Sequence, residues 1–238
     1  VSVFTAAIQN KVKRIVFCSS MARYGEIKPP FYESQTPKPV DPYGVSKLAS
    51  EEILRILCET HGLEYNIAIP HNVIGQKQKY DDPFRNVVSI MTNLMLQNRR
   101  PIIFGDGEQV RSFSDIKDCI YCIDKLARDK KIKSEVFNIG PDEEFITINE
   151  LYEILCNKLS FNKDPKYYAD RPNEVKKAIC SSDKAREKLN YKTTVSLSES
   201  IDGVIKYIRE NKPRKFDYHK DLEILNKKTP RPWKEKLF

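Results

Sequence analysis

The sequence predicts an α/β protein built on a parallel sheet. Short β-rich runs alternate along the chain with stretches of helical periodicity, which is typical of parallel α/β architecture. The run Arg14–Cys18 is almost entirely apolar, and we expect it to be a strand buried on both faces. A length of 238 residues with 40% hydrophobic and 31% charged residues excludes a disordered chain and a collagen-like repeat.

The first part of the chain supplies two strands and two helical segments. Residues Val1–Asn10 read as the end of a helix, and a proline-rich loop follows the first strand. The next helix is expected over about Tyr43–His61, where Gly62 ends it because glycine adopts the left-handed conformation that closes helices. A second strand, Tyr65–Ile69, is ended by Pro70.

The rest of the chain continues the alternation. Further helices are expected over Phe84–Gln97, from Asp115 onward, from Thr147 to Leu159, over Asp183–Leu189 and over Leu197–Glu210. Further strands are expected over Pro101–Phe104, near Arg111–Phe113 and over Val136–Ile139, with a turn at Gly105–Gly107. Helical spacing after Asp115 predicts an apolar face made of Ile116, Ile120, Ile123 and Leu126. Thr147 with Glu150 three residues later predicts a capping box.

The net charge of +8 does not indicate a nucleic-acid partner. From Asn211 onward the chain carries +5 of this charge, which we interpret as a solvated basic tail. The remainder mixes its charges, without a long run of one sign. No apolar run approaches the roughly 18–20 residues that cross a bilayer, so no membrane partner is expected either.

The six cysteines favour a reducing cytoplasm. Most of them lie within apolar segments, as small buried hydrophobic residues do. Cys119 and Cys122 have the spacing of half a metal site, but no second pair and no nearby histidine accompanies them. We therefore predict no metal site.

Tyr43 and Lys47 are the most informative pair of residues. They lie four residues apart on a predicted helix and share one of its faces. A phenol titrates near pH ~10, so it needs a nearby ammonium to act as a base around neutrality. Taken alone, the pair favours an exposed aromatic ring beside a solvated lysine.

The segment before this helix changes that interpretation. The strand Arg14–Cys18 leads directly into Ser19 and Ser20, and parallel sheets place reacting groups at the carboxyl ends of their strands. Ser20 would then orient a substrate hydroxyl beside the Tyr43 oxygen. The alternative for the two serines is a simple turn or a helix cap.

Several segments in a fixed order resemble a known family. They are Val12–Ser20, Tyr24–Gly25, Asp41–Lys47, Pro70–Gly75, Phe104–Gly107 and Arg171–Glu174. From residue 1 to about 211, the chain resembles the extended short-chain dehydrogenase/reductases, specifically the NAD-dependent nucleotide-sugar epimerases and dehydratases, and among them the UDP-glucose 4-epimerase-like proteins. The resemblance implies a Rossmann-like parallel sheet, a smaller C-terminal substrate-binding region, and NAD as the cofactor.

The resemblance also implies roles for single residues. Tyr43 would be the proton acceptor, Lys47 would also hold the nicotinamide ribose, and Ser20 would bind the sugar hydroxyl. Contacts with the cofactor are implied for Ser19, Tyr43, Lys47 and Pro70. Contacts with the nucleotide sugar are implied for Tyr24, Asn72, Arg111, Arg171 and Glu174. The planar guanidinium fork suits the two arginines for pyrophosphate, whereas surface ion pairs are the alternative without the family.

The residues after Ser20 favour epimerisation over elimination. The family's dehydratases carry an Asp-Glu pair there and its decarboxylases a Glu, whereas Met21 and Ala22 can supply neither an acid nor a base. We therefore expect a nucleotide-sugar 4-epimerase of the UDP-glucose/UDP-galactose type. A nucleotide-sugar reductase or decarboxylase and a non-catalytic nucleotide-sugar-binding remnant stay open as alternatives. Arg23 replaces the family's usual aliphatic residue, and His71 replaces its usual aromatic; we assign His71 no proton transfer.

The family's glycine-rich turn, in which helix N–H groups meet the dinucleotide pyrophosphate, has no counterpart here. Gly105 and Gly107 come nearest, but Val110 breaks the pattern. We expect that the N-terminal glycine-rich part is missing, through a partial sequence or a truncated or split protein, and that the chain is inactive without it.

We expect three regions and a homodimer. Residues 1–75 are predicted to be the C-terminal part of the NAD-binding Rossmann domain, with the catalytic tyrosine and lysine. Residues 76–211 are predicted to be a mixed substrate-binding region with returning Rossmann strands, and residues 212–238 a basic tail. The homodimer is implied by the family alone.

Overall fold

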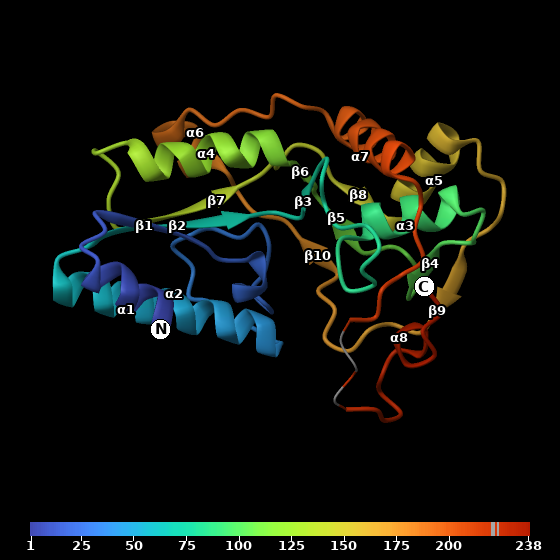
Figure 1. Cartoon of the computed structure of the whole chain (residues 1–238), viewed down its shortest axis with the longest axis horizontal. Helices are drawn as coiled ribbons and strands as arrows, with labels where there is room; N and C mark the ends of the chain where they lie inside the picture. Colours follow the sequence, from blue (N-terminus) through green and yellow to red (C-terminus); the bar gives the residue numbers. More distant parts are fainter. Residues whose placement is uncertain (220–221, 223) are drawn as a thin grey trace. The chain divides into compact units, whose positions relative to one another are not determined.

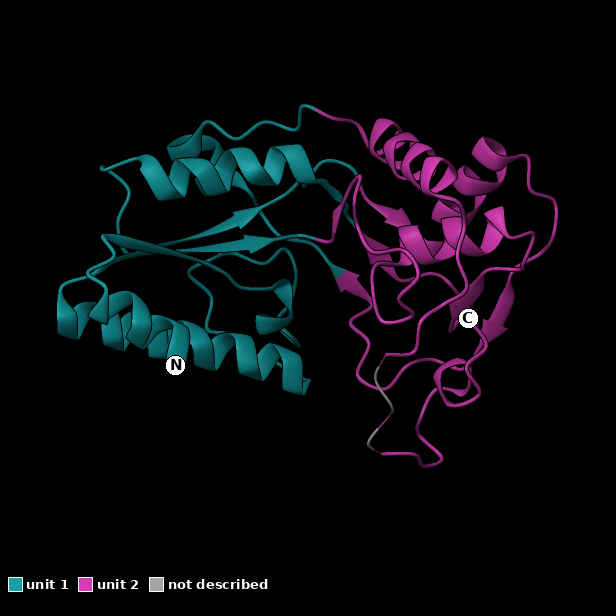
Figure 2. Ribbon diagram, viewed as in Figure 1, with its two compact units in different colours: residues 1–71, 112–144, 178–194 teal, residues 72–111, 145–177, 195–238 magenta. Residues whose placement is uncertain are grey.

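The computed structural model describes residues 1–219, 222 and 224–238, which form two compact units (Figures 1 and 2). Unit 1 contains residues 1–71, 112–144 and 178–194, and unit 2 contains residues 72–111, 145–177 and 195–238. Both combine helices with strands, and the predicted α/β class with parallel strands is confirmed. The predicted division at residues 75 and 211 stays a prediction.

A three-stranded parallel sheet forms the centre of unit 1. Its strand order is β1 (Arg14–Cys18), β2 (Glu64–Pro70) and β7 (Glu135–Ile139). The register pairs Cys18 with Ala68, and Ala68 in turn with Phe137. The three strands therefore end at the same edge of the sheet, where sites in parallel α/β proteins are found.

Helices cover both faces of this sheet (Figure 1). On one face lie α1 (Ser2–Gln9) and α2 (Pro42–His61), and on the other α4 (Ile116–Arg128) and α6 (Asp183–Leu189). A short 3₁₀ helix, η1 (Met21–Arg23), follows β1. The predicted end of α2 is confirmed, because Gly62 closes the helix with φ 68°.

Strand β1 is less buried than the sequence predicts. Its residues are half-buried and Cys18 is exposed, although both faces were expected to be covered. In the described part of the chain, β1 pairs with β2 alone and lies at the edge of its sheet. An edge strand has fewer neighbours to cover it, which accounts for the difference.

The buried face of α4 also differs from the prediction. Ile120 is 55% exposed, whereas Cys119, Cys122 and Leu126 are fully buried. These three residues lie on one helical face, so the cysteine pair belongs to the hydrophobic core. Burial raises the pKa of both thiols to about 12 and keeps them protonated.

In its described residues, unit 2 combines four helices with strands of two or three residues. Its helices are α3 (Val87–Leu96), α5 (Ile148–Leu159), α7 (Leu197–Asn211) and α8 (Arg231–Lys234). Strand β4 (Ile102–Phe104) pairs in parallel with β9 (Lys166–Tyr168), and β5 (Val110–Arg111) pairs antiparallel with β8 (Ile146–Thr147). Further two-residue strands are β3 (Val73–Ile74), β6 (Ser114–Asp115, in unit 1) and β10 (Lys177–Ala178). The predicted capping box of Thr147 and Glu150 opens α5 as expected.

The basic segment 212–238 is not a simple solvated tail. Its described lysines and arginines are exposed, as predicted. Its aromatic residues, however, join a core cluster of unit 2, where Phe216 and Phe238 pack with residues of α3 and β4. Within the described residues, no helix has both the length and the apolar character needed to span a membrane.

Candidate active site

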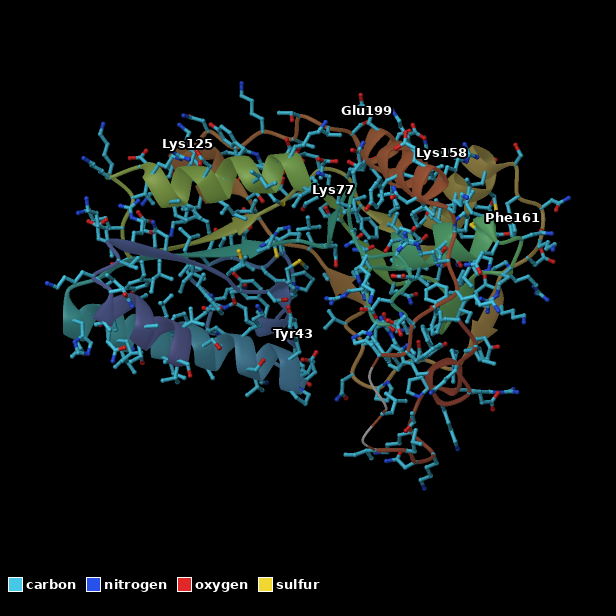
Figure 3. The ribbon with its side chains drawn as sticks, viewed as in Figure 1. Tyr43, Lys77, Lys125, Lys158, Phe161 and Glu199 are labelled. Carbon is cyan, nitrogen blue, oxygen red and sulfur yellow. The ribbon has the colours of Figure 1, made fainter. Side chains whose placement is uncertain are left out.

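Tyr43 and Lys47 occupy the first turns of α2 in unit 1. Asp41 caps this helix by accepting the Gly44 N–H at 2.7 Å, and Pro42 fixes the backbone of the first turn. The Tyr43 side chain lies at the surface near the beginning of the helix (Figure 3) and is 55% exposed. A reacting group needs such access to a substrate.

The Lys47 ammonium connects this helix to the end of β1. Its Nζ donates a hydrogen bond to the Cys18 carbonyl at 2.8 Å. It also lies 5.7 Å from the centre of the Tyr43 ring and 5.2 Å from that of Phe17. The positive charge is thereby fixed beside the phenol at the carboxyl edge of the sheet.

Glu51 continues the same face of α2 one turn further. It is 3% exposed, accepts a hydrogen bond from the Ser19 hydroxyl, and forms an ion pair with Arg23 at 2.7 Å. Burial raises the pKa of its carboxyl, although the Ser19 hydrogen bond and the charge of Arg23 act in the opposite direction. Our sequence analysis missed Glu51, but its position four residues after Lys47 was a usable signal.

The two serines after β1 have different surroundings. Ser19 is buried, and its hydroxyl faces Glu51. Ser20 caps η1 by accepting the Ala22 N–H at 3.2 Å, which is the helix-cap alternative considered above. A hydroxyl that accepts a bond retains its own proton for donation, so capping is compatible with a substrate contact of Ser20. The implied cofactor contact of Ser19 rests on the resemblance alone.

Tyr24 is part of the core of unit 1. Its side chain is fully buried, stacks on Phe31 at 5.0 Å between ring centres, and donates a hydrogen bond to Asn138 Oδ1 at 2.8 Å. Burial raises the pKa of its phenol well above the usual range. The implied substrate contact of Tyr24 therefore rests on the resemblance and not on exposure of the side chain.

Pro70 and His71 lie where β2 ends. Pro70 pairs with Ile139 of β7, and the His71 N–H donates to the Ile139 carbonyl at 2.9 Å. The imidazole is buried, and this burial lowers the pKa of His71 to about 3, although nearby Asp142 opposes the shift. The ring is therefore neutral and packed, and the assignment of no proton transfer to His71 stays a prediction. Gly140 has φ 152°, and a Cβ there would lie 2.8 Å from His71 Nδ1.

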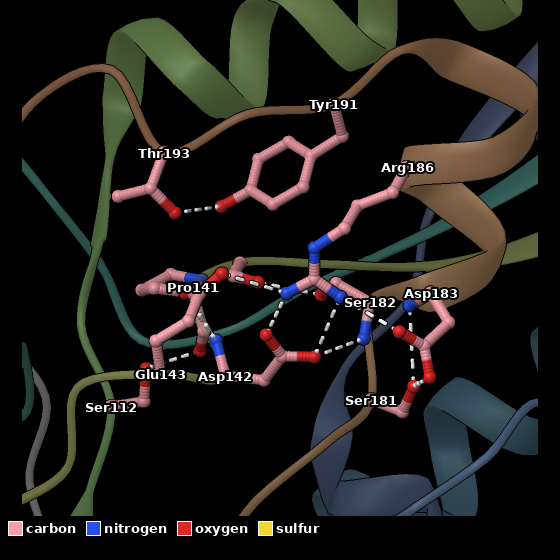
Figure 4. Close-up of polar contacts among 11 residues, drawn as sticks. Ser112, Pro141, Asp142, Glu143, Ser181, Ser182, Asp183, Arg186, Tyr191 and Thr193 are labelled. Carbon is pink, nitrogen blue, oxygen red and sulfur yellow. Dashed lines mark hydrogen bonds and ion pairs between the residues drawn. The ribbon is translucent and has the colours of Figure 1, made fainter.

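The loop after Gly140 is held by a network of charged groups (Figure 4). The Arg186 guanidinium donates to both oxygens of Asp142 and to Glu143, and Asp142 also accepts the Ser182 N–H at 2.8 Å. Burial acts to raise the pKa of Asp142, but the hydrogen bonds from Arg186 and Ser182 hold it below its usual range. The loop beside His71 is thus anchored to α6.

Unit 2 contains a separate group of implied substrate contacts. Glu174 accepts hydrogen bonds from Arg111 at 3.2 Å and from Arg171 at 2.5 and 3.1 Å. The Glu174 side chain is 6% exposed, whereas that of Arg171 is 38% exposed. Burial lowers the pKa of the Arg111 guanidinium, against the effect of Glu174. One carboxylate therefore holds two guanidinium groups together, and this favours a site for a polyanion.

The implied site residues divide between the two units. Ser19, Ser20, Tyr24, Tyr43, Lys47 and Pro70 belong to unit 1, and Asn72, Arg111, Arg171 and Glu174 belong to unit 2. Asn72 begins unit 2 with φ 29°, in the left-handed region that asparagine tolerates. The implied proton acceptor, Tyr43, and the ammonium of Lys47 belong to unit 1. The residues implied to bind the anionic part of the nucleotide sugar belong to unit 2.

A family comparison matches residues 1–140 to the NAD dependent epimerase/dehydratase family. The chain belongs to this family. It is 35% identical over 204 residues to a putative UDP-glucose 4-epimerase of Methanocaldococcus jannaschii, a match that covers 84% of this chain and 64% of that relative. The chain therefore spans just under two thirds of the relative's length.

Solved structures support the same membership. A UDP-glucose 4-epimerase of Thermotoga maritima with UDP-glucose has a TM-score of 0.82 and 33% identity, covering 88% of this chain and 67% of that one. A UDP-glucuronic acid 4-epimerase of Bacillus cereus in complex with UDP-glucuronic acid and NAD has a TM-score of 0.82 and 28% identity, covering 88% and 66%. The resemblance identified from the sequence is confirmed.

The epimerase-family residues of unit 1 fit one end of NAD. An ammonium has three N–H donors and the bond to Cys18 uses one, so Lys47 can also donate to ribose hydroxyls. The pyrophosphate end has no matching cradle in the Gly105–Gly107 turn. Asn149 there fills the space that a Cβ on Gly107 would need.

The first prediction concerns the buried ion pair. Arg23→Met leaves Glu51 buried without its cation, and we expect a loss of about 3–5 kcal/mol in the free energy of unfolding, measured by urea denaturation. The double variant Arg23→Met/Glu51→Leu should recover most of this loss, because it removes both charges. Arg55→Met is the control, since this exposed arginine pairs with Glu52 and Glu59 on the same helix. A loss no larger than that of the control would contradict a buried pair.

The second prediction concerns pH. The folded state holds His71 neutral down to about pH 3, whereas the unfolded chain binds a proton near pH 6.5. Unfolding is therefore favoured as the pH falls below 6.5, and His71 should remove about 2 kcal/mol of stability between pH 7 and 5. His71→Phe should flatten this part of the stability curve, and exposed His61→Gln should leave it unchanged. Equal slopes in wild type and His71→Phe would show that another group titrates.

Proposed function

We propose that this chain carries the proton-transfer and nucleotide-sugar-binding residues of a 4-epimerase that acts on UDP-sugars of the UDP-glucose/UDP-galactose type. The observation that carries the proposal is the Lys47 ammonium, held by the Cys18 carbonyl and close to the ring of exposed Tyr43. The T. maritima and M. jannaschii relatives, with their UDP-glucose names, support this substrate class.

In the proposed reaction, Tyr43 accepts the proton of the sugar's 4-hydroxyl as the C4–H bond breaks. Lys47 holds its positive charge near the Tyr43 ring and stabilises the negative charge that the phenol oxygen gains in this step. Ser20 donates a hydrogen bond to the same sugar oxygen and orients it. When bound, NAD would supply the hydride chemistry at C4, as acceptor first and as donor afterwards, and Lys47 would hold its ribose. Tyr43 then returns its proton to the C4 oxygen, which becomes the 4-hydroxyl of the product.

Arg111 and Arg171 are proposed to bind the pyrophosphate of the nucleotide sugar. The shared carboxylate of Glu174 fixes both forks before the ligand arrives, which reduces the entropy that binding must remove. A guanidinium has five N–H donors, more than the two bonds from Arg171 to Glu174 use. Arg111 donates Nη1 to the Val110 and Lys176 carbonyls and Nη2 to Glu174, so its Nε and one Nη2 hydrogen stay available for phosphate oxygens.

Within the family, the side chains after Ser20 favour epimerisation. Met21 and Ala22 of η1 offer no acid or base for elimination. A reductase or decarboxylase would yield a different product from the same UDP-sugar, and a binding remnant would yield none. Product analysis with UDP-glucose, UDP-galactose and UDP-glucuronate separates these outcomes.

We also propose the cytoplasm as the compartment and a homodimer as the assembly. The six cysteines are free thiols, and four of them are buried, which supports a reducing environment. The homodimer rests on the family alone, and sedimentation of the purified protein tests it.

The third prediction is that, in the complete enzyme with its N-terminal glycine-rich part, Tyr43→Phe lowers kcat by about 10²–10⁴-fold, because proton transfer by a positioned group contributes about this much. The affinity for UDP-glucose should change less than about twofold, since the phenol does not contribute to pyrophosphate binding. Turnover is measured by exchange of UDP-glucose and UDP-galactose in protein whose NAD content has been determined after acid release.

Tyr32→Phe is the matched control, because Tyr32 is a similarly exposed tyrosine of the same unit. It should retain wild-type turnover. Normal turnover of Tyr43→Phe would reject Tyr43 as the base. Bound UDP without NAD or turnover in the wild type would favour a binding protein.

The fourth prediction concerns the pyrophosphate. Arg111→Ala and Arg171→Ala should each weaken UDP binding at least about tenfold in calorimetric titrations, because each removes charge-assisted hydrogen bonds to phosphate. Binding of uridine, which has no phosphate, should not depend on either arginine. Unchanged UDP affinity in both variants would place the anion site elsewhere.

A further inference from the structure

The C-terminal segment is tied to the body of unit 2 at several points. The Trp233 indole N–H donates to the Pro83 carbonyl at 3.3 Å, and the Phe238 N–H donates to the Tyr218 hydroxyl at 3.0 Å. Arg99, which follows α3, donates to the Leu237 carbonyl at 3.0 Å. These bonds, together with buried Phe216, hold α8 in a defined place.

Trp233 of α8 lies within a row of aromatic rings. Its ring centre is 5.8 Å from that of Phe84 and 5.7 Å from that of Phe104, with tilted planes in both pairs. Phe104, the last residue of β4, also contacts the Arg171 guanidinium, whose central carbon lies 5.3 Å from the ring centre. A continuous path of contacts therefore joins the C-terminal segment to Arg171.

Arg171 is restrained in two complementary ways. Glu174 binds the edge of its guanidinium through Nε and Nη2, which limits motion in the plane of the group. The Phe104 ring adds a cation–π contact, which limits motion out of that plane. Phe104 can do this only if its own ring is held, and Trp233 packs against it.

We propose that Trp233 is a positioning residue for nucleotide binding, which makes the C-terminal segment a structural part of the pyrophosphate site. Trp233 supports the Phe104 ring, and Phe104 orients the Arg171 guanidinium for the phosphates of a nucleoside diphosphate. This inference rests on the proposed phosphate-binding role of Arg171. It adds that the segment after α7 is required for full affinity.

Calorimetric titration of the full chain with UDP tests this role, first with two substitutions of Trp233 and a matched control. Trp233→Leu should weaken UDP binding about five- to tenfold, in line with the loss of one cation–π and stacking arrangement, and Trp233→Phe should restore binding to within about twofold of wild type. Phe216→Leu is the matched control, because Phe216 belongs to the same core cluster and its ring contacts that of Phe238 in a tilted arrangement. It should leave UDP affinity within about twofold of wild type.

The double variant Trp233→Leu/Arg171→Ala separates positioning from general destabilisation. If Trp233 acts through Arg171, the double variant should bind UDP no more weakly than Arg171→Ala alone. An additional loss in the double variant, or a loss in Phe216→Leu equal to that in Trp233→Leu, would overturn the proposal. Wild-type affinity in Trp233→Leu would overturn it as well.

Failure of the underlying proposal has a different signature. If Arg171→Ala binds UDP as tightly as the wild type, Arg171 is not a phosphate ligand, and the role of Trp233 falls with it. The chain has one tryptophan, so fluorescence excited at wavelengths that tyrosine does not absorb reports on Trp233 alone. UDP should change this emission in the wild type and not in Arg171→Ala, whereas uridine should change it in neither.

Discussion

The hydrogen bond from the Lys47 ammonium to the Cys18 carbonyl is the contact on which the candidate active site depends. It joins the first turns of α2 to the end of β1, two elements that are far apart in the sequence. The same ammonium lies beside the Tyr43 ring, so one group sets both the position of the helix and the charge near the phenol. A substitution of Lys47 would therefore remove both the link between α2 and β1 and the positive charge near Tyr43.

One turn further along α2, Glu51 forms a buried ion pair with Arg23 of η1. We assign this pair a structural role in the interior of unit 1. Both side chains are almost fully buried, and Glu51 also accepts the Ser19 hydroxyl. A buried pair gains little net stability over an apolar pair of similar size, yet removal of one partner is costly. We infer that the cluster fixes the turn after β1, from which Ser20 projects.

The sequence predicts the features that depend on local signals. The Thr147 capping box, the Gly62 helix end and the parallel strands all follow from neighbouring residues, and the ordered motifs predict the family. The Glu51–Arg23 ion pair and the Phe104–Trp233 ring contact join segments that are distant in the sequence, and no local pattern encodes them. The buried face of α4 was mispredicted because hydrophobicity alone does not show which apolar side chains of a helix face the core. Cys119 and Cys122 are buried, whereas Ile120 is exposed. Tyr24 is a second example, because a sequence motif does not show whether the tyrosine hydroxyl binds a ligand or another side chain. In this structure it donates a hydrogen bond to Asn138.

The placement of Arg23 also bears on substrate choice. Relatives named for UDP-glucose and for UDP-glucuronic acid have equally similar folds, so the backbone does not distinguish a neutral sugar from an acidic one. A uronate carboxylate would favour a nearby cation, and Arg23 is the unusual basic residue in the segment after β1. The Arg23 side chain is nevertheless only 8% exposed and already forms an ion pair with Glu51. Taking it from that carboxylate would leave a buried charge uncompensated, at a cost larger than a single sugar contact is worth. The ion pair with Glu51 therefore gives the unusual Arg23 a structural role in the interior of unit 1.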